Sequence, residues 1–143
     1  RVAQDNIRFA MEYMIKEIRM GTSYHCGAPE GGITPLDCDF GSGQNFLTFR
    51  NDDGATVVYK LIGSRLYRAD TAPYDDDDNY KPVSSQGITF TNLTFYVTGT
   101  GTVLTADRKQ PKITITAEVE AGIGTTKSTF NLQTTVSQRS LDS

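Results

Sequence analysis

Both cysteines and the single histidine of the chain lie in one short stretch, YHCGAPEGGITPLDC. Gly and Pro are frequent between Cys26 and Cys38, and no helical or strand-like pattern fixes this loop. A disulfide would stabilise such a loop by about 3 kcal/mol, mainly by restricting the unfolded chain. We therefore expect a Cys26–Cys38 disulfide and an oxidising compartment, with two free thiols in a cytosolic protein as the alternative.

His25 is next to Cys26, and a Cys–His pair is one way to activate a nucleophilic thiolate. A disulfide at Cys26 removes that chemistry. The chain also has no G-x-S-x-G, no H-E-x-x-H and no glycine-rich phosphate loop that opens a helix. A zinc site is not indicated, because His25 is the only histidine and there is no C-x-x-C. We expect no enzymatic activity.

The acidic run in TAPYDDDDNYKPVSSQ (71–86) is the one candidate for an ion site. Asp75, Asp77 and Asn79 alternate as they do at the start of a calcium-binding loop. The sixth position holds Tyr80 in place of Gly, and the twelfth holds Gln86 in place of Glu, so this is not an EF-hand. The alternatives are a calcium site made by these three side chains with backbone carbonyls, and a solvated loop. Apart from such a calcium ion, we expect no cofactor.

The first 21 residues predict an amphipathic helix that must position one face against the rest of the chain. Gly21 supplies a stop at its C-terminus, and Arg19 in the last turn suits the helix dipole. Charged residues occupy the opposite side. The apolar residues at helical spacing are Ile7, Ala10, Met11, Met14 and Ile18.

A second apolar stripe on the same helix lies well away from the first and consists of Phe9, Tyr13 and Met20. A helix that only covered its own sheet would not require this stripe. Two interpretations remain open: the stripe packs under a loop of the same domain, or it contacts another protein.

The remainder of the chain alternates with the period of two that is typical of strands. NFLTFRN (45–51), ATVVYKLIG (55–63) and RLYRAD (65–70) predict a meander whose first turn is the hairpin turn Asn51–Gly54. In the strand 87–99 the apolar phase slips after Thr91-Asn92, which indicates a β-bulge. Segments 112–121 and 128–139 predict an antiparallel hairpin.

These elements predict an α+β fold in which one N-terminal amphipathic helix packs on an antiparallel β-sheet of five or six strands. We expect residues 1–143 to form a single domain, with the helix at 1–21 and the β-rich part at 45–139. The net charge is −3, and the basic cluster Arg108, Lys109 and Lys112 has no interleaved aromatic residue. Nucleic acid is therefore not an expected partner.

Four stretches give the chain a family resemblance: EIRMG at the end of the helix, FLTFRNDDGATVVYKLIGSRLYR, GITFTNLTFYVTG, and NLQTTVSQR near the end. In this order, with a cysteine-bearing loop after the helix, they resemble the soluble part of bacterial type IV pilin-like proteins. The resemblance is in particular to minor pilins and to type II secretion pseudopilins of the J-like group. The resemblance covers nearly all of the chain and implies a pilin-like fold.

The resemblance also implies a leader cut by a prepilin peptidase, a methylated N-terminus and an apolar half-helix ahead of Arg1. Residues 1–21 would then be the C-terminal half of the pilin helix. The apolar half would anchor the subunit in the inner membrane, with the globular part in the periplasm. After assembly the subunit would belong to a fibre at the cell surface or outside the cell.

The function that the resemblance implies is that of a structural minor subunit of a type IV pilus or type II secretion pseudopilus. Its partners would be other pilin or pseudopilin subunits, with Phe9, Tyr13 and Met20 packing between neighbours. Some pseudopilins bind calcium in a surface loop, which adds to the interest of Asp75 and its neighbours. The alternative is a surface or fibre-tip binding module, an adhesin or a DNA or substrate contact, that uses loops 26–38 and 71–86.

Overall fold

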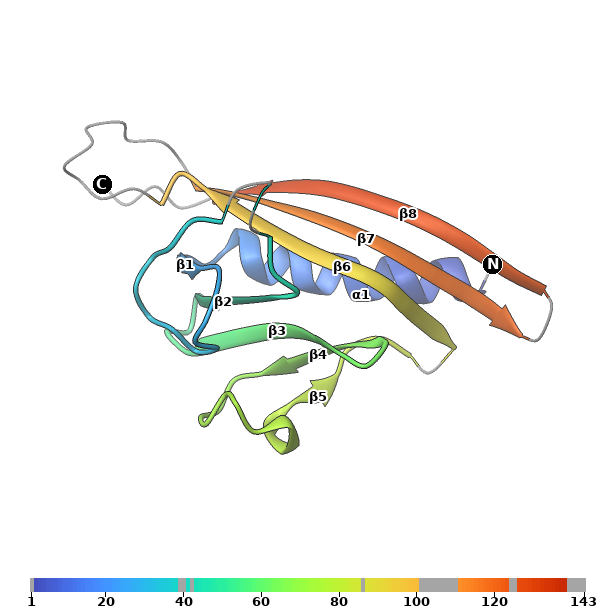
Figure 1. Ribbon diagram of the computed structural model, residues 1–143, viewed down its shortest axis with the longest axis horizontal. Helices are drawn as coiled ribbons and strands as arrows, with labels where there is room; N and C mark the ends of the chain where they lie inside the picture. Colours follow the sequence, from blue (N-terminus) through green and yellow to red (C-terminus); the bar gives the residue numbers. More distant parts are fainter. Residues whose placement is uncertain are drawn as a thin grey trace.

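The computed structural model describes residues 2–38, 41, 43–85, 87–100, 111–123 and 126–138. The chain begins with one helix and continues with strands, as predicted (Figure 1). The elements in chain order are α1 (Val2–Arg19), β1 (Thr22–His25), β2 (Phe46–Arg50), β3 (Thr56–Ile62), β4 (Arg65–Ala69), the 3-10 helix η1 (Asp77–Asn79), β5 (Lys81–Pro82), β6 (Ile88–Thr98), β7 (Lys112–Ile123) and β8 (Thr126–Ser137).

The strands form two sheets, where the sequence predicted one. Strands β1 to β5 lie in order in the first sheet, β6 to β8 lie in order in the second, and all neighbours are antiparallel. Isolated bridges from Cys38 to Val97 and from Gln44 to Phe95 connect the segment before β2 to β6. The α+β class is confirmed, and the prediction of a single sheet was wrong.

Strands β1 and β5 were not predicted, because neither has a clear alternating pattern in the sequence. Strand β1 contains Ser23 with a φ of 57°, a left-handed conformation that interrupts regular strand geometry. Strand β5 is two residues long and includes Pro82, which cannot donate to a ladder. It lies inside segment 71–86, which the sequence predicted to be entirely loop.

The apolar face of α1 is buried as predicted, with Met14 and Ile18 fully inaccessible. The helix contacts β6 and β8, and Figure 1 shows it running along the second sheet. Burying a Met or Ile side chain contributes roughly 1.5–3 kcal/mol, so this face fixes the helix on the sheet. Within the described ranges, no helix combines the length and apolar composition that a membrane crossing needs. The buried helix residues are Ile7, Ala10, Met11, Met14 and Ile18.

The predicted Asn51–Gly54 turn and the predicted bulge are confirmed. In the β2–β3 turn, the Asn51 N–H donates to the Ala55 carbonyl (2.9 Å). The Asn51 Oδ1 accepts from the Asp53 and Ala55 N–H groups, and Gly54 supplies a φ of +84°. In β6 the register shifts between Phe90 and Asn92, where the apolar phase slips in the sequence.

The long hairpin β7–β8 is also confirmed, and it extends further than predicted. The inward residues of β7 are buried, whereas Phe130 and Leu132 on β8 are only half-buried. Arg108 and Lys109 of the basic cluster lie outside the described residues. The buried β7 residues are Ile113, Ile115, Ala117, Val119 and Ala121.

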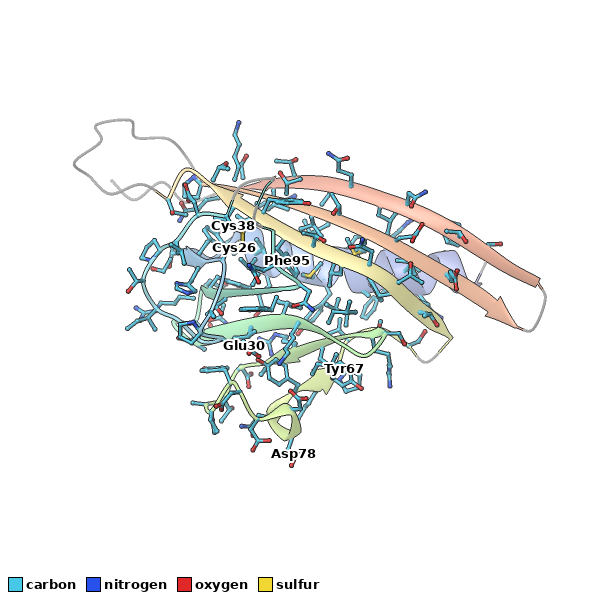
Figure 2. The ribbon with its side chains drawn as sticks, viewed as in Figure 1. Cys26, Glu30, Cys38, Tyr67, Asp78 and Phe95 are labelled. Atoms are coloured by element: carbon cyan, nitrogen blue, oxygen red, sulfur yellow. A yellow bond between two sulfur atoms is a disulfide. The ribbon has the colours of Figure 1, made fainter. Side chains whose placement is uncertain are left out.

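The predicted disulfide is present between Cys26 and Cys38, with a Cα–Cα distance of 5.6 Å (Figure 2). Both cysteines are buried, and their sulfur atoms lie 3.6 and 3.3 Å from the Phe95 carbonyl oxygen of β6. The disulfide therefore closes the loop directly against the second sheet.

Gly21 ends the helix for a different reason from the one the sequence suggested. Its N–H donates to the Ile18 carbonyl (3.0 Å), but its φ is not positive. A Cβ at Gly21 would lie 2.6 Å from Phe49 Cδ2 and 2.9 Å from the Arg50 carbonyl oxygen. Close packing of the chain against β2 therefore requires glycine here.

We predict that Gly21→Ala lowers the free energy of unfolding by about 1–3 kcal/mol, because Phe49 and the β2 backbone must move. Gly87→Ala is the matched control, since a Cβ there meets nothing within 4 Å. That variant should stay within about 0.5 kcal/mol of the parent. Urea denaturation of both variants measures the difference, and equal midpoints would contradict the packing argument.

Candidate functional site

The second stripe of α1 is exposed. Phe9 is 68% exposed, Tyr13 46% and Met20 39%, although the opposite helix face is buried. The Phe9 and Tyr13 ring centroids are 6.4 Å apart, so the two rings form one continuous apolar surface. Such a surface on a helix that is already anchored is available to a partner. These exposures favour the second of the two interpretations of the stripe.

A groove of about 600 Å³ lies between this stripe and the end of the first sheet. Phe9 and Tyr13 line it on the helix side, and Lys81, Pro82 and Val83 line it on the other. A second, more open depression of about 380 Å³ lies on the outer side of the same two rings. The rings therefore form a ridge between two hollows. The other residues that line the 380 Å³ depression are Asp5, Arg8, Glu12 and Lys16.

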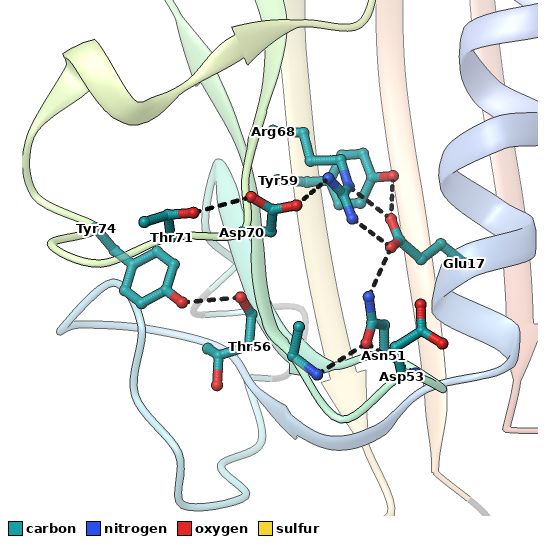
Figure 3. Close-up of polar contacts among 10 residues, drawn as sticks. Glu17, Asn51, Asp53, Thr56, Tyr59, Arg68, Asp70, Thr71 and Tyr74 are labelled. Carbon is teal, nitrogen blue, oxygen red and sulfur yellow. Dashed lines mark hydrogen bonds and ion pairs between the residues drawn. The ribbon is translucent and has the colours of Figure 1, made fainter.

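A polar cluster around Glu17 connects α1 to the first sheet beside this groove (Figure 3). Arg68 on β4 donates from Nη2 to Glu17 Oε2 at 2.6 Å and from Nε to Oε1 at 2.9 Å. The Tyr59 hydroxyl donates to Glu17 Oε1 (2.6 Å), and Asn51 Nδ2 donates to Oε2 (3.2 Å). Both carboxylate oxygens are thus satisfied, and the orientation of the helix relative to β3 and β4 is fixed.

The electrostatics of this cluster favour the ionised pair. Burial alone would raise the pKa of Glu17, but hydrogen bonds from Arg68, Tyr59 and Asn51 outweigh it and lower that pKa below its ordinary value. The hydrogen bond to Glu17 raises the pKa of Arg68. Burial, with a further contribution from the Glu17 carboxylate, raises the pKa of the Tyr59 hydroxyl. At neutral pH the cluster is a carboxylate held by one cation and two neutral donors.

Two loops that are far apart in the sequence lie together on another part of the first sheet. Lys60 Nζ on β3 pairs with Glu30 Oε2 in the disulfide loop (2.5 Å) and with Asp77 Oδ1 in η1 (3.4 Å). Gly31, with a φ of +86°, packs directly against the ring of Tyr74. Loops 26–38 and 71–86 therefore share one surface.

The residues of the proposed calcium site make other contacts. Asn79 Nδ2 donates to the Pro73 carbonyl (2.8 Å), and Asp77 faces Lys60. Asp76 caps η1 by accepting from the Asp78 N–H (3.0 Å). Among the residues that the structure describes, no three His, Cys, Asp or Glu side chains are grouped to hold a metal ion. The calcium site of Asp75, Asp77 and Asn79 stays a prediction.

His25 is buried beside the disulfide. Its Nδ1 lies 2.5 Å from the Thr34 carbonyl oxygen, and the ring lies against Gly32, where a Cβ would be 2.5 Å from Nε2. Cys26 is oxidised in the disulfide, so the Cys–His pair has no thiolate. The ring instead supports the fold of the loop.

The sequence indicated the aromatic stripe but not the groove or the Glu17 cluster. Arg68 is opposite Tyr59 in the β3–β4 register, and this pairing places both beside the helix. The separations of Asn51, Tyr59 and Arg68 from Glu17 are 34, 42 and 51 residues. A local pattern does not reveal contacts at that range. The one available indication was a carboxylate at the border of the buried helix face.

We predict that Glu17→Gln lowers the free energy of unfolding by about 2 kcal/mol at neutral pH, since it leaves Arg68 without its charged acceptor. Asp70→Asn is the matched control, because Asp70 contacts the same Arg68 at 3.2 Å but its side chain is 54% exposed. Asp70→Asn should lower the free energy of unfolding by less than about 0.5 kcal/mol. Denaturant melts of the two variants compare them directly.

The effect of Glu17→Gln should depend on pH in a defined direction. The folded-state pKa of Glu17 is lowered, so its stabilisation is fully present above the ordinary carboxyl pKa. It is lost as the pH falls through the lowered folded-state value. The stability gap between parent and variant should therefore narrow in acid, and a gap that stayed constant would contradict the role given to Glu17.

The comparisons with known proteins identify no relative of this chain. Comparison of the chain with family models, with curated proteins and with solved structures found no match in any of the three. The features of the molecule that bear on function are the exposed stripe, the groove and the paired loops, together with the resemblance of the sequence.

Proposed function

We propose that this chain is the globular part of a structural minor subunit of a bacterial type IV pilus or type II secretion pseudopilus. The observation that carries the proposal is the exposed stripe of Phe9, Tyr13 and Met20 on a helix whose other face is already buried. An α+β arrangement with one N-terminal helix is compatible with the pilin-like fold that the sequence resembles. In this proposal the stripe packs against a neighbouring subunit.

The geometry of the stripe suits packing between helices. Phe9 and Tyr13 are four residues apart and therefore lie one above the other on the helix surface. Side chains in such rows form the ridges that fit into grooves of a facing helix. Burying each ring would contribute roughly 1.5–3 kcal/mol, and the two hollows beside the ridge leave space for the partner's side chains.

The proposal also requires features ahead of the helix. An apolar half-helix joined to α1 would anchor the subunit in the inner membrane before assembly and would lie in the core of the fibre afterwards. A native reading frame with a leader ending in Gly, followed by Phe-x-x-x-Glu and an apolar run, is the expected result. A frame without an apolar run ahead of Arg1 would contradict the proposal.

We predict that the double change Phe9→Ser and Tyr13→Ser in the full-length gene abolishes incorporation of the subunit into fibres. Both side chains are exposed, so the fold should survive, and its thermal melt should match that of the parent. Incorporation is measured as the fraction of the subunit recovered in fibres sheared from cells. Ile33→Ser is the matched control, because Ile33 is 70% exposed but lies in the disulfide loop.

Two results would overturn the packing role of the stripe. One is normal incorporation of the double variant. The other is equal loss of incorporation in the Ile33 control, because that would indicate a general effect of removing exposed apolar side chains.

A second candidate function is favoured by the paired loops. Lys60 and the Gly31–Tyr74 contact bring loops 26–38 and 71–86 onto one surface, and Ile33 and Leu36 are 70% and 43% exposed there. Exposed apolar side chains on such a surface are suited to binding an external ligand, as a fibre-tip adhesin would.

The two candidate functions are separated by a loop variant. Under the binding-module alternative, Ile33→Ser with Leu36→Ser leaves fibre assembly intact but lowers attachment of the cells to surfaces. Under the purely structural function both properties stay unchanged. Fibre recovery and attachment are measured on the same cultures, so a loss of both together would support neither assignment of the loop.

A further inference from the structure

Strand β8 is the outermost strand of the second sheet (Figure 1). It pairs with β7 along its whole length, from Lys112 opposite Ser137 to Ile123 opposite Thr126. Among the residues that the structure describes, no other strand pairs with it. One edge of a 12-residue strand therefore presents its backbone N–H and C=O groups outward.

The direction of these groups follows from the ladder. Directly after β8, the Gln138 N–H donates to the Pro111 carbonyl (3.1 Å), in the same register as the strand pair. In an antiparallel ladder, residues two apart point their backbone groups to the same side. Even-numbered residues of β8 therefore bond to β7, and odd-numbered residues point to the free edge. The odd-numbered row includes Thr129, Asn131, Gln133 and Thr135, whose side chains are all exposed.

Apart from Lys127 at its N-terminal end, this edge lacks the features that usually prevent strand pairing. Segment 128–137, STFNLQTTVS, contains no charged residue and no proline. The β7–β8 register contains no bulge that would twist the edge away. Natural sheets normally protect a long free edge with lysine, proline, a bulge or a covering element. An unprotected edge of this length indicates a surface that receives another strand.

We propose that β8 pairs edge to edge with β8 of a second copy of this chain, in an antiparallel arrangement about a twofold axis. The edge is complementary to itself in the register centred on Leu132. There Thr129 is opposite Thr135 of the second copy, and Asn131 is opposite Gln133. Odd-numbered residues meet odd-numbered residues, so every outward N–H and C=O in this row has a partner.

The side chains also favour a second copy as the occupant. Thr–Thr pairs and amide pairs across strands are favourable, and the absence of charge in this segment means that no like charges oppose each other. On the inner face, Leu132 would contact its own counterpart, and Phe130 would be opposite Thr134. Phe130 and Leu132 are half-buried in one copy, so the second copy would cover them further. This contact is separate from the α1 stripe and does not depend on the proposed function.

The test is the association state of the whole chain, measured by sedimentation from micromolar to millimolar concentration. We expect a monomer–dimer equilibrium that Gln133→Lys abolishes, because two lysines would meet close to the twofold axis. Thr89→Lys is the matched control: Thr89 is also exposed, but it lies on β6 at the other side of the same sheet. The control should dimerise as the parent does.

Amide hydrogen exchange adds a readout that a different dimer would not give. In the dimer, exchange should slow at Thr129, Asn131, Gln133 and Thr135, whereas even-numbered amides of β8 are already protected by β7. A monomer at all concentrations would overturn the proposal. A dimer that survives Gln133→Lys would do the same, as would one that Thr89→Lys or the Phe9 and Tyr13 changes abolish.

Discussion

Helix α1 contacts both sheets at once, and the arrangement of the whole molecule depends on this constraint. Its apolar face packs on β6 and β8, while Glu17 reaches across to Arg68, Tyr59 and Asn51 of the first sheet. Burial of the apolar face sets which side of the helix faces the sheet, but apolar contacts have no preferred direction within that face. The two-point contact with Arg68 supplies that direction. With both fixed, Phe9 and Tyr13 can only face outward.

Local periodicity predicted the elements that local physics determines. The helix face, the β2–β3–β4 meander, the Asn51–Gly54 turn and the β7–β8 hairpin all follow from the spacing of apolar and turn residues. The bulge in β6 was also visible, since a register slip moves every later side chain to the other face of the sheet. The disulfide followed from the composition of the loop. The exposed stripe was predictable as a second face, although its exposure was not.

Features that depend on distant contacts were not predictable. The division into two sheets was missed, and so were β1 and β5 at the two ends of the first sheet, where Ser23 and Pro82 interrupt regular strand patterns. The Glu17 cluster needs the β3–β4 register and the position of the helix together. The role of Gly21 is similar, because the obstacle to a side chain there is Phe49 of β2 and not the local backbone. For Glu17 and Gly21 the partner residues lie in strands that the sequence predicted, but local periodicity does not specify which elements meet.

The contacts of Lys60 have a consequence for how the two surface loops can change. Its ammonium group is shared between Glu30 of one loop and Asp77 of the other, and Gly31 leaves room for the ring of Tyr74. A substitution in either loop alters the environment of the other. Grafting one loop from a related chain would separate it from the partner that shapes it. The two loops should therefore be exchanged together, in engineering as in divergence, although three strands separate them in the sequence.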